Sequence, residues 1–472
     1  MKLALLAALL CASGSPEGIP SRPEELHFAA AEVRLGSPAE HRHRLPNGAV
    51  VYVIENHSLP LVDVMVLAPL GSALDPPGRA GLATLTARLL RRGASAKHSA
   101  AELGDAFDRL AARREVVAGE VLTTASLNLL SGSLEAGLPL FFESLREPAF
   151  AEDALASERE ALLTELGRRA NDPAALADRG WRNLLYGAEV VSAQTPTAGS
   201  LGGIRREDLL ELHRRTFAAS GLVVAVAGDV STPAVLKALE AELSRFPGGR
   251  RAPLRLPAGA APKASPGVYF QAAGGSQDSV ILGQPGWSWQ GRFADADLYA
   301  WMLLHEVLVG GELSSRLVRS LRSEEGLVYY PSSDPGLALA TQGTFQIRFR
   351  TRPEKVALAV EKVRAEIARL ASEPPSADET EIARASLLSR LGRTFESPKD
   401  LATLFAQDEA LGRPAGFWPG APARYRQLTP ADLARVAAKM LRSEELTVLI
   451  SGPSPPPADL SRLGAVTLAA AP

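Results

Sequence analysis

The sequence has few of the residues that build metal sites or disulfides. Its only cysteine, Cys11, lies in a leader segment, so the mature chain has no disulfide, thiol nucleophile or thiolate metal ligand. Beyond the leader, no apolar run reaches the about 20 residues that a transmembrane helix needs. The formal net charge is −2, so no excess of basic residues indicates nucleic-acid binding.

The histidines are too scattered for a local metal site. None lies three to five residues from another, although His41 and His43 would share a strand face and chelate weakly. His305 precedes Glu306 but has no second histidine at 308–310, so we interpret it as an ordinary helix residue. The seven histidines occupy positions 27, 41, 43, 57, 98, 213 and 305. Phosphate-loop, dinucleotide and G-x-S-x-G motifs are also missing, although a dispersed Ser or Asp mechanism stays open.

Residues 1–15 are interpreted as an export signal. One lysine precedes an apolar run too short to span a bilayer, and small residues follow at 12–15. We therefore expect a periplasmic or exported bacterial protein, a location that suits an exported chain without disulfides. Two alternatives stay open. In the first, the segment is a buried N-terminal strand or a misplaced start. In the second, Cys11 is lipidated and anchors the chain to a membrane, although Leu10 before it is bulky for a lipoprotein cleavage site.

The chain is long enough for two domains. With 472 residues, 46% of them hydrophobic and 22% charged, it has an ordinary globular composition but exceeds one compact core. Residues 248–267 are rich in glycine and proline and form the expected linker. We therefore expect an arm at 16–38, a domain at 39–247, a second domain at 268–455 and a tail at 456–472.

The two halves repeat each other. Asn47-Gly48 between apolar runs predicts a hairpin, followed by a strand at 62–67 and helices at 80–90 and 100–112. At an offset of 224, Asp208 falls on Asp432 and Gly228 on Gly452; at an offset of 217, the strand at 62–67 falls on 280–282. The sequence therefore predicts an α+β fold of two homologous α/β sandwich domains, duplicated in one chain.

Several segments of the sequence carry a family resemblance. The order and spacing of these segments, given below, resemble those of the pitrilysin/insulinase family of zinc peptidases. Within that family they resemble the two-domain subunits typified by mitochondrial processing peptidase. The likeness covers about residues 40–455. The segments are Leu45–Gly48, Gly71-Ser72 ahead of Gly81, Glu158–Glu165 followed by Asn171–Pro173, Val224–Asp229, and Gly310–Tyr329.

The resemblance implies a zinc helix that this chain has lost. The family places two histidines and a glutamate base in an H-x-x-E-H helix, and these positions fall on Thr84, Arg88 and Ala87. Threonine is a poor ligand, arginine is a permanent cation, and alanine accepts no proton. Glu165, 77 residues after Arg88, matches the third ligand, and Glu158 matches a supporting acid. Arg88 and Glu165 either pair in place of zinc, or Glu165 faces water.

The second half keeps a family signature. The stretch from Gly310 to Tyr329 resembles S-S-R-L…R-x(6)-Y, in which the arginine and tyrosine contact substrate near the scissile bond and stabilise its oxyanion. Here these residues are Arg322 and Tyr329. The structural alternative is that Arg322 caps a helix and Tyr329 fills the core.

The resemblance implies a catalytically silent subunit, inactive alone, with no cofactor of its own. It would form a heterodimer with a zinc-bearing homologous subunit and supply Arg322 and Tyr329 for the hydrolysis of unfolded peptides. The alternative is a peptide-binding or scaffold protein of the same fold. A third hypothesis, an enzyme with an unrecognised site, also stays open.

Overall fold

The computed structural model describes residues 36–170, 172–187, 190, 195–248, 261–262, 266–287, 295–311, 314–337 and 343–469. All of these residues lie in one compact unit, 33–472. The leader with Cys11, nearly all of the arm and most of the linker lie outside the described residues. Within the described ranges, no helix is both long and apolar enough to cross a membrane.

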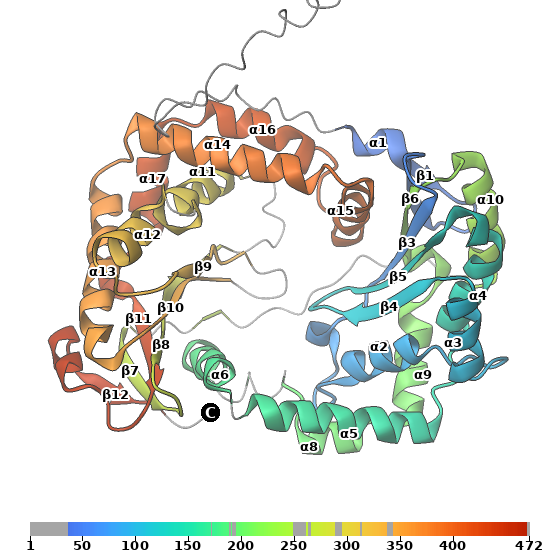
Figure 1. The fold of residues 1–472 in the computed structure, drawn as a ribbon, viewed down its shortest axis with the longest axis horizontal. Helices are drawn as coiled ribbons and strands as arrows, with labels where there is room; N and C mark the ends of the chain where they lie inside the picture. The colour runs from blue at the N-terminus through green and yellow to red at the C-terminus, as the bar shows by residue number, and fades with distance from the viewer. Residues whose placement is uncertain are drawn as a thin grey trace, which may run out of the picture. The chain divides into compact units, whose positions relative to one another are not determined.

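The N-terminal half is a six-stranded mixed sheet with its larger helices on one face (Figure 1). Its strand order is β1-β2-β6-β3-β5-β4. The strands are β1 (Arg42–Arg44), β2 (Val50–Glu55), β3 (Leu61–Ala68), β4 (Arg113–Ala118), β5 (Thr123–Leu130) and β6 (Val223–Gly228). The helices include α1 (Pro38–His41), α2 (Leu82–Arg92), α3 (Ala100–Arg109), α4 (Leu134–Arg146), α5 (Glu152–Arg169), α6 (Pro173–Tyr186), α8 (Ala198–Gly203), α9 (Arg206–Thr216) and α10 (Thr232–Leu243).

The C-terminal half repeats this plan in the order β12-β7-β11-β8-β10-β9. The strands are β7 (Gly267–Ala272), β8 (Asp278–Pro285), β9 (Ser332–Asp334), β10 (Thr344–Thr351), β11 (Thr447–Gly452) and β12 (Val466–Leu468). The helices include α11 (Ala296–His305), α12 (Arg316–Val318), α13 (Val356–Ser372), α14 (Ala377–Thr394), α15 (Pro398–Leu411), α16 (Phe417–Gln427) and α17 (Pro430–Met440), with π-helical turns η5 (Glu306–Gly310) and η7 (Arg319–Glu324).

Strand pairing confirms the duplication and the predicted fold class. β2 pairs in parallel with β6, and β7 pairs in parallel with β11. In both sheets the remaining central pairs are antiparallel. The outermost strand next to this parallel pair differs, because β1 is antiparallel to β2 whereas β12 is parallel to β7. Two copies of one α/β plan therefore lie in one chain.

The predicted hairpin forms at Asn47-Gly48. β1 and β2 pair antiparallel, and the Leu45 amide donates to the Ala49 carbonyl at 2.9 Å. Gly48 has φ +90°, a conformation that favours glycine. The predicted strand at 62–67 lies within β3, and the helices expected at 80–90 and 100–112 are α2 and α3.

The two halves exchange one helix each (Figure 1). α6 packs on β8 and β11 of the C-terminal sheet, where Trp181 meets Ile281 and Leu449. Its counterpart α15 packs on β2, β3 and β6 of the N-terminal sheet, where Phe405 meets Tyr52. The other face of each sheet is covered by its own helices. The central strands of both sheets are thus apolar on both faces, which explains strands without clear polar alternation, such as β6.

The C-terminal segment differs from the expected tail at 456–472. Leu460 and Leu463 pack into the C-terminal core, and β12 extends the sheet beside β7. These residues join the domain because β7 would otherwise leave its outer edge unpaired. At the other end, α1 begins at Pro38, inside the expected arm.

Candidate functional site

α2 occupies the position of the family zinc helix. It begins after Gly81, which has φ +99°, and Asp75 caps it by accepting from the Gly81 and Ala83 amides at 2.8 Å each. Burial raises the pKa of Asp75 to about 6, although these amides oppose the shift. Thr84 and Arg88 are half-buried on this helix, and Ala87 is 2% exposed. The helix is therefore well formed, but it carries no ligand at the expected positions.

An arginine occupies the place where the family resemblance expects a metal. Arg88 forms an ion pair and hydrogen bond with Glu165 and lies 3.8 Å from Glu158. Arg92 pairs with Glu158 at 3.1 Å, and Arg169 with Glu165 at 2.6 Å. The hydrogen bond from Arg88 lowers the pKa of Glu165, so this carboxylate stays ionised. Of the two arrangements that the sequence left open, the structure has the ion pair.

These residues do not fit a zinc ion. Zinc needs neutral histidine or anionic ligands around one point, whereas the two carboxylates here are paired with three guanidinium groups. Among the described residues, no group of three or more His, Cys, Asp or Glu side chains has an arrangement that suits a metal ion. His41 lies at the end of α1, not on β1, and its Nδ1 contacts the Val53 carbonyl at 3.1 Å.

The C-terminal half has an equivalent ion pair with reversed charges. Glu306, at the start of η5, pairs with Arg390 on α14 and accepts from Ser386 at 2.8 Å. α14 is the counterpart of α5, so acid and base have exchanged helices. The adjacent His305 is buried, contacts Ser333 at 2.8 Å, and has its pKa lowered to about 4 by burial. His305 is therefore a buried residue at the end of α11, which agrees with its interpretation as an ordinary helix residue.

The structure brings Arg322 and Tyr329 together. The Arg322 Cζ lies 5.4 Å from the centroid of the Tyr329 ring. Tyr329 is 86% exposed, so it does not fill the core as the structural alternative required. Leu321 and Leu327 fill that space instead. A guanidinium and a phenol hydroxyl are therefore presented together to solvent.

The rest of the signature is structural where it is described. Arg316 is buried and forms a two-point ion pair with Glu379 at 2.7 and 2.9 Å. This contact lowers the pKa of Glu379 to about 2. Glu312 and Leu313 lie outside the described residues.

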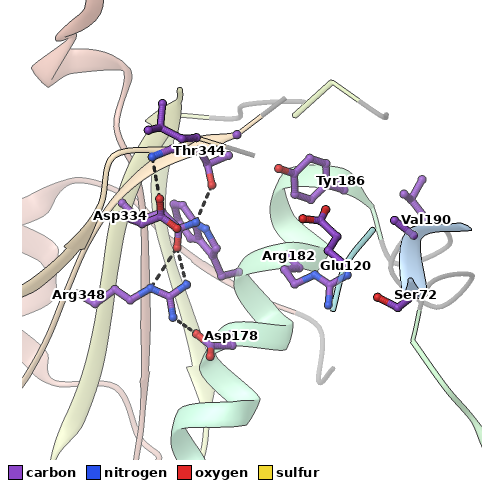
Figure 2. A pocket seen from close by; sticks show the side chains of 15 residues that line it. Ser72, Glu120, Asp178, Arg182, Tyr186, Val190, Asp334, Thr344 and Arg348 are labelled. Carbon is purple, nitrogen blue, oxygen red and sulfur yellow. Dashed lines mark hydrogen bonds and ion pairs between the residues drawn. The ribbon is translucent and has the colours of Figure 1, made fainter. Parts of the chain in front are cut away.

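A polar cavity of about 590 Å³ lies beside β10, between residues of both halves (Figure 2). Glu120, Asp178 and Arg182 line it from the N-terminal half, and Asp334 and Arg348 from the C-terminal half. The sequence analysis missed this cavity. The sequence feature that could have indicated this cavity is the pattern of β10, where core side chains alternate with the polar residues Thr344, Gln346, Arg348 and Arg350.

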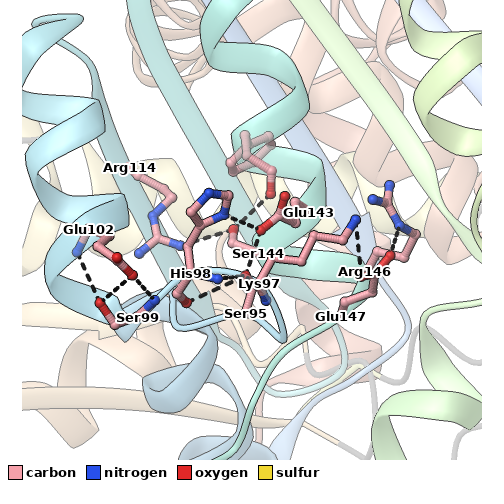
Figure 3. A network of polar contacts seen from close by, with 11 residues as sticks. Ser95, Lys97, His98, Ser99, Glu102, Arg114, Glu143, Ser144, Arg146 and Glu147 are labelled. Carbon is pink, nitrogen blue, oxygen red and sulfur yellow. Dashed lines mark hydrogen bonds and ion pairs between the residues drawn. The ribbon is translucent and has the colours of Figure 1, made fainter.

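A serine, a histidine and a glutamate also meet between α3 and α4 (Figure 3). Ser95 Oγ donates to Glu143 at 2.5 Å, and His98 Nδ1 contacts the same carboxylate oxygen at 2.8 Å. Ser95 Oγ also accepts from the His98 amide at 2.9 Å. The serine therefore bonds to the acid and not to the imidazole that would activate it, so the cluster stabilises the turn before α3.

Comparison with known proteins agrees with this geometry. Residues 203–387 match the sequence profile of the peptidase M16 inactive domain. An "uncharacterized zinc protease" of Rickettsia bellii is 24% identical over 357 residues, 74% of this chain and 82% of the relative. The "non-peptidase homolog YmxG" of Helicobacter pylori is 26% identical over 340 residues, 67% of this chain and 73% of the relative. A crystal structure of a peptidase M16 inactive domain from Pseudomonas fluorescens has the same fold, with a TM-score of 0.76 at 24% identity, covering 88% of this chain and 98% of that one.

The chain is similar to M16 peptidase homologues over most of its length. The resemblance to the pitrilysin/insulinase zinc peptidases is thereby confirmed. The profile match begins at Gly203 and so includes neither α2 nor α5. The loss of the zinc site is read from Thr84, Ala87 and Arg88 themselves. Together with the name of the Helicobacter relative, these residues support a non-catalytic M16 member.

Proposed function

We propose that this M16 homologue is the silent subunit of a heteromeric zinc peptidase. A homologous partner subunit would carry the zinc, and this chain would supply Arg322 and Tyr329 to the bound peptide. The observation that carries the proposal is the contrast between the two sites. Arg88 fills the former metal position, whereas Tyr329 is 86% exposed beside Arg322.

The chemistry of the pair suits a peptide carbonyl. A guanidinium offers a planar fork of donors, and a phenol offers one hydroxyl donor. Among the described residues, the structure records no side-chain interaction for Arg322 or Tyr329 other than the contact between the two. Both side chains are therefore available to a bound peptide. Donors directed at a developing oxyanion stabilise the transition state more than the ground state. The pair would thus orient the scissile bond while the partner supplies the nucleophile.

Mixing experiments test this role. The chain alone should not cleave unfolded peptides, and a zinc-bearing M16 homologue from the same cell should gain activity when it is added. Arg322→Ala or Tyr329→Phe should then lower kcat by about 10²–10³-fold, the usual effect of losing one oxyanion donor. Arg319→Ala is the matched control, because Arg319 lies on the same π-helical turn and its ion pair within the described residues is with Glu324, at 3.9 Å.

The readouts separate catalysis from assembly. Size-exclusion chromatography should show the same complex for every variant. A change confined to KM would mean that the pair binds substrate and transition state equally. If both substitutions leave turnover unchanged, the pair is structural and the chain is a scaffold or peptide-binding protein. The leader predicts export, so we expect the complex to be periplasmic or exported, and fractionation of the source cell tests this expectation.

A further inference from the structure

A second cavity, of about 700 Å³, lies at the other end of β10. Its floor is formed by Ser279–Ile281 of β8 and by the β10 strand from Arg348 onward. One wall is the start of α6, at Ala174, Ala177 and Asp178, and the other is the segment from Gly326 to Tyr330. Asp178 and Arg348 also line the cavity of Figure 2, so their ion pair separates the two spaces.

The charge of this second cavity is positive. Arg348, Arg350 and Arg352 line it, whereas Asp178 is the acid in its lining. Asp178 is already paired with Arg348, as Figure 2 shows. Arg352 lies 3.6 Å from Glu354, and both of these side chains are largely exposed. Arg350 is exposed and has no ion pair with any described residue.

The position of Arg350 follows from the strand. Phe345, Ile347 and Phe349 point into the C-terminal core, so the alternate residues Arg348 and Arg350 lie on the face toward α6. Arg350 is paired in register with Ser279 of β8, on the cavity floor. The sheet therefore holds the base of this side chain, while no acid among the described residues pairs with its guanidinium.

The rim of the cavity is suited to an extended chain. β9 begins at Ser332, which pairs with Arg348, so the part of the chain that the structure describes provides no strand partner for Phe349–Thr351 on that side. Tyr329 and Tyr330 are exposed next to this open stretch. An open strand edge beside aromatic side chains is a common way of binding extended peptides.

We propose that this cavity binds an acidic side chain of an extended peptide, with Arg350 as the residue that contacts its carboxylate. The inference rests on the proposed function, because Tyr329 belongs both to this cavity and to the proposed substrate pair. It adds a preference that the proposed function does not contain. Peptides with Asp or Glu near the scissile bond would be selected over neutral ones, because a guanidinium binds a carboxylate through two parallel hydrogen bonds.

Binding to the full chain alone tests this preference apart from catalysis. The probes are a fluorescein-labelled glycine-serine peptide that carries glutamates and its isosteric glutamine twin, measured by fluorescence anisotropy. The wild-type chain should bind the glutamate peptide about tenfold more tightly, the effect of one charge-assisted contact. Arg350→Gln should abolish the difference. Arg44→Gln, an exposed strand arginine on β1 in the other half, is the matched control and should retain it.

The preference should also shrink as salt rises from low to molar concentration, because the contact is accessible to solvent. Equal binding of the two peptides by the wild-type chain, or a preference that survives Arg350→Gln, overturns the inference. Failure of either peptide to bind overturns it as well. None of these results decides the proposed function, which depends on turnover in the mixed complex and on Arg322→Ala.

Discussion

Asp278 shows how one residue can make stability depend on pH. It is 0% exposed at the start of β8, and neither carboxylate oxygen has a hydrogen-bond partner among the described residues. Gly452 lies against it so closely that a Cβ there would be 1.5 Å from the Oδ1 of Asp278. Burial, with further repulsion from Asp459 and Glu354, raises the pKa of Asp278 to about 6.

The raised pKa predicts that stability falls as the pH rises from about 4 through 6. Below the unfolded pKa near 4, both states hold the proton and the group has no effect; between about 4 and 6 the folded state keeps a proton that the unfolded state releases. At pH 7.5 the folded chain therefore bears an unfavourable buried charge. Asp278→Asn should raise the free energy of unfolding there by about 2 kcal/mol, and the gain should vanish near pH 4, as urea titrations across this range will show.

Asp432 provides the opposite control. It caps α17, and its bonds to Thr429 lower its pKa. Asp432→Asn should therefore lose stability at neutral pH and converge with the wild type as the pH falls through the depressed pKa. If Asp278→Asn behaves in the same way, Asp278 is charged and well paired in the native state.

At the scale of single residues, the sequence predicted the degenerate zinc positions but not the peptide-binding role proposed for Arg350. Thr84, Ala87 and Arg88 were assigned through the family resemblance and its motif spacing, and Glu165 through its separation from Arg88 within that resemblance. The role of Arg350 depends on the ion pairs of its neighbours. Arg348 is neutralised by Asp178, 170 residues away in the sequence, and no local pattern predicts such a contact.

At the scale of elements, ion pairs from Arg88 and Arg92 tie α2 to α5. Where the family resemblance expects a metal, Glu165 and Glu158 on α5 form ion pairs with Arg88 and Arg92 on α2. The equivalent interface in the other half uses Glu306 and Arg390, with the charges exchanged. The same helix contact therefore tolerates either orientation of the pair, provided that both charges are present.

This exchange predicts the result of swapping the charges of Arg88 and Glu165. Arg88→Ala should cost about 1–3 kcal/mol, because it leaves the carboxylates of Glu158 and Glu165 on α5 with one cation fewer. Glu165→Ala should cost less, since Arg88 still lies near Glu158. The double variant Arg88→Glu with Glu165→Arg should recover at least half of the loss, measured by the urea midpoint. Strict additivity of the two single changes would instead show that the groups do not interact in solution.

Elements were predicted where local rules decide them. The Asn47-Gly48 hairpin, β3, α2 and α3 follow from turn chemistry and periodicity. The π-helical turns at Glu306–Gly310 and Arg319–Glu324 did not follow, because one added residue in a helix hardly changes its apolar period. β12 was missed for another reason, since three residues become a strand only when β7 offers them an edge.

At the scale of the whole molecule, the linker misleads as a domain boundary. It places α6 with the N-terminal half and α15 with the C-terminal half, as any reading of chain order would. Hydrophobic pattern shows that these helices need a sheet, but not which sheet, because both sheets present similar apolar faces. The exchange joins the two copies through Trp181 on one side and Phe405 on the other.

The exchange predicts that neither half is stable alone. A fragment ending at residue 248 would expose Tyr52 and Met65, which α15 covers, and would leave Trp181 without its sheet. A fragment beginning at residue 261 would expose Ile281 and Leu449 in the same way. Each lost aromatic anchor is worth about 3–5 kcal/mol, a large part of the usual stability of a domain. Separately purified fragments should therefore bind a hydrophobic dye and unfold without a sharp transition, whereas co-expressed fragments should associate and unfold cooperatively. A C-terminal fragment that alone matches the urea midpoint of the full chain would show that α6 contributes little to its sheet, and the halves would then be independent domains joined by the linker.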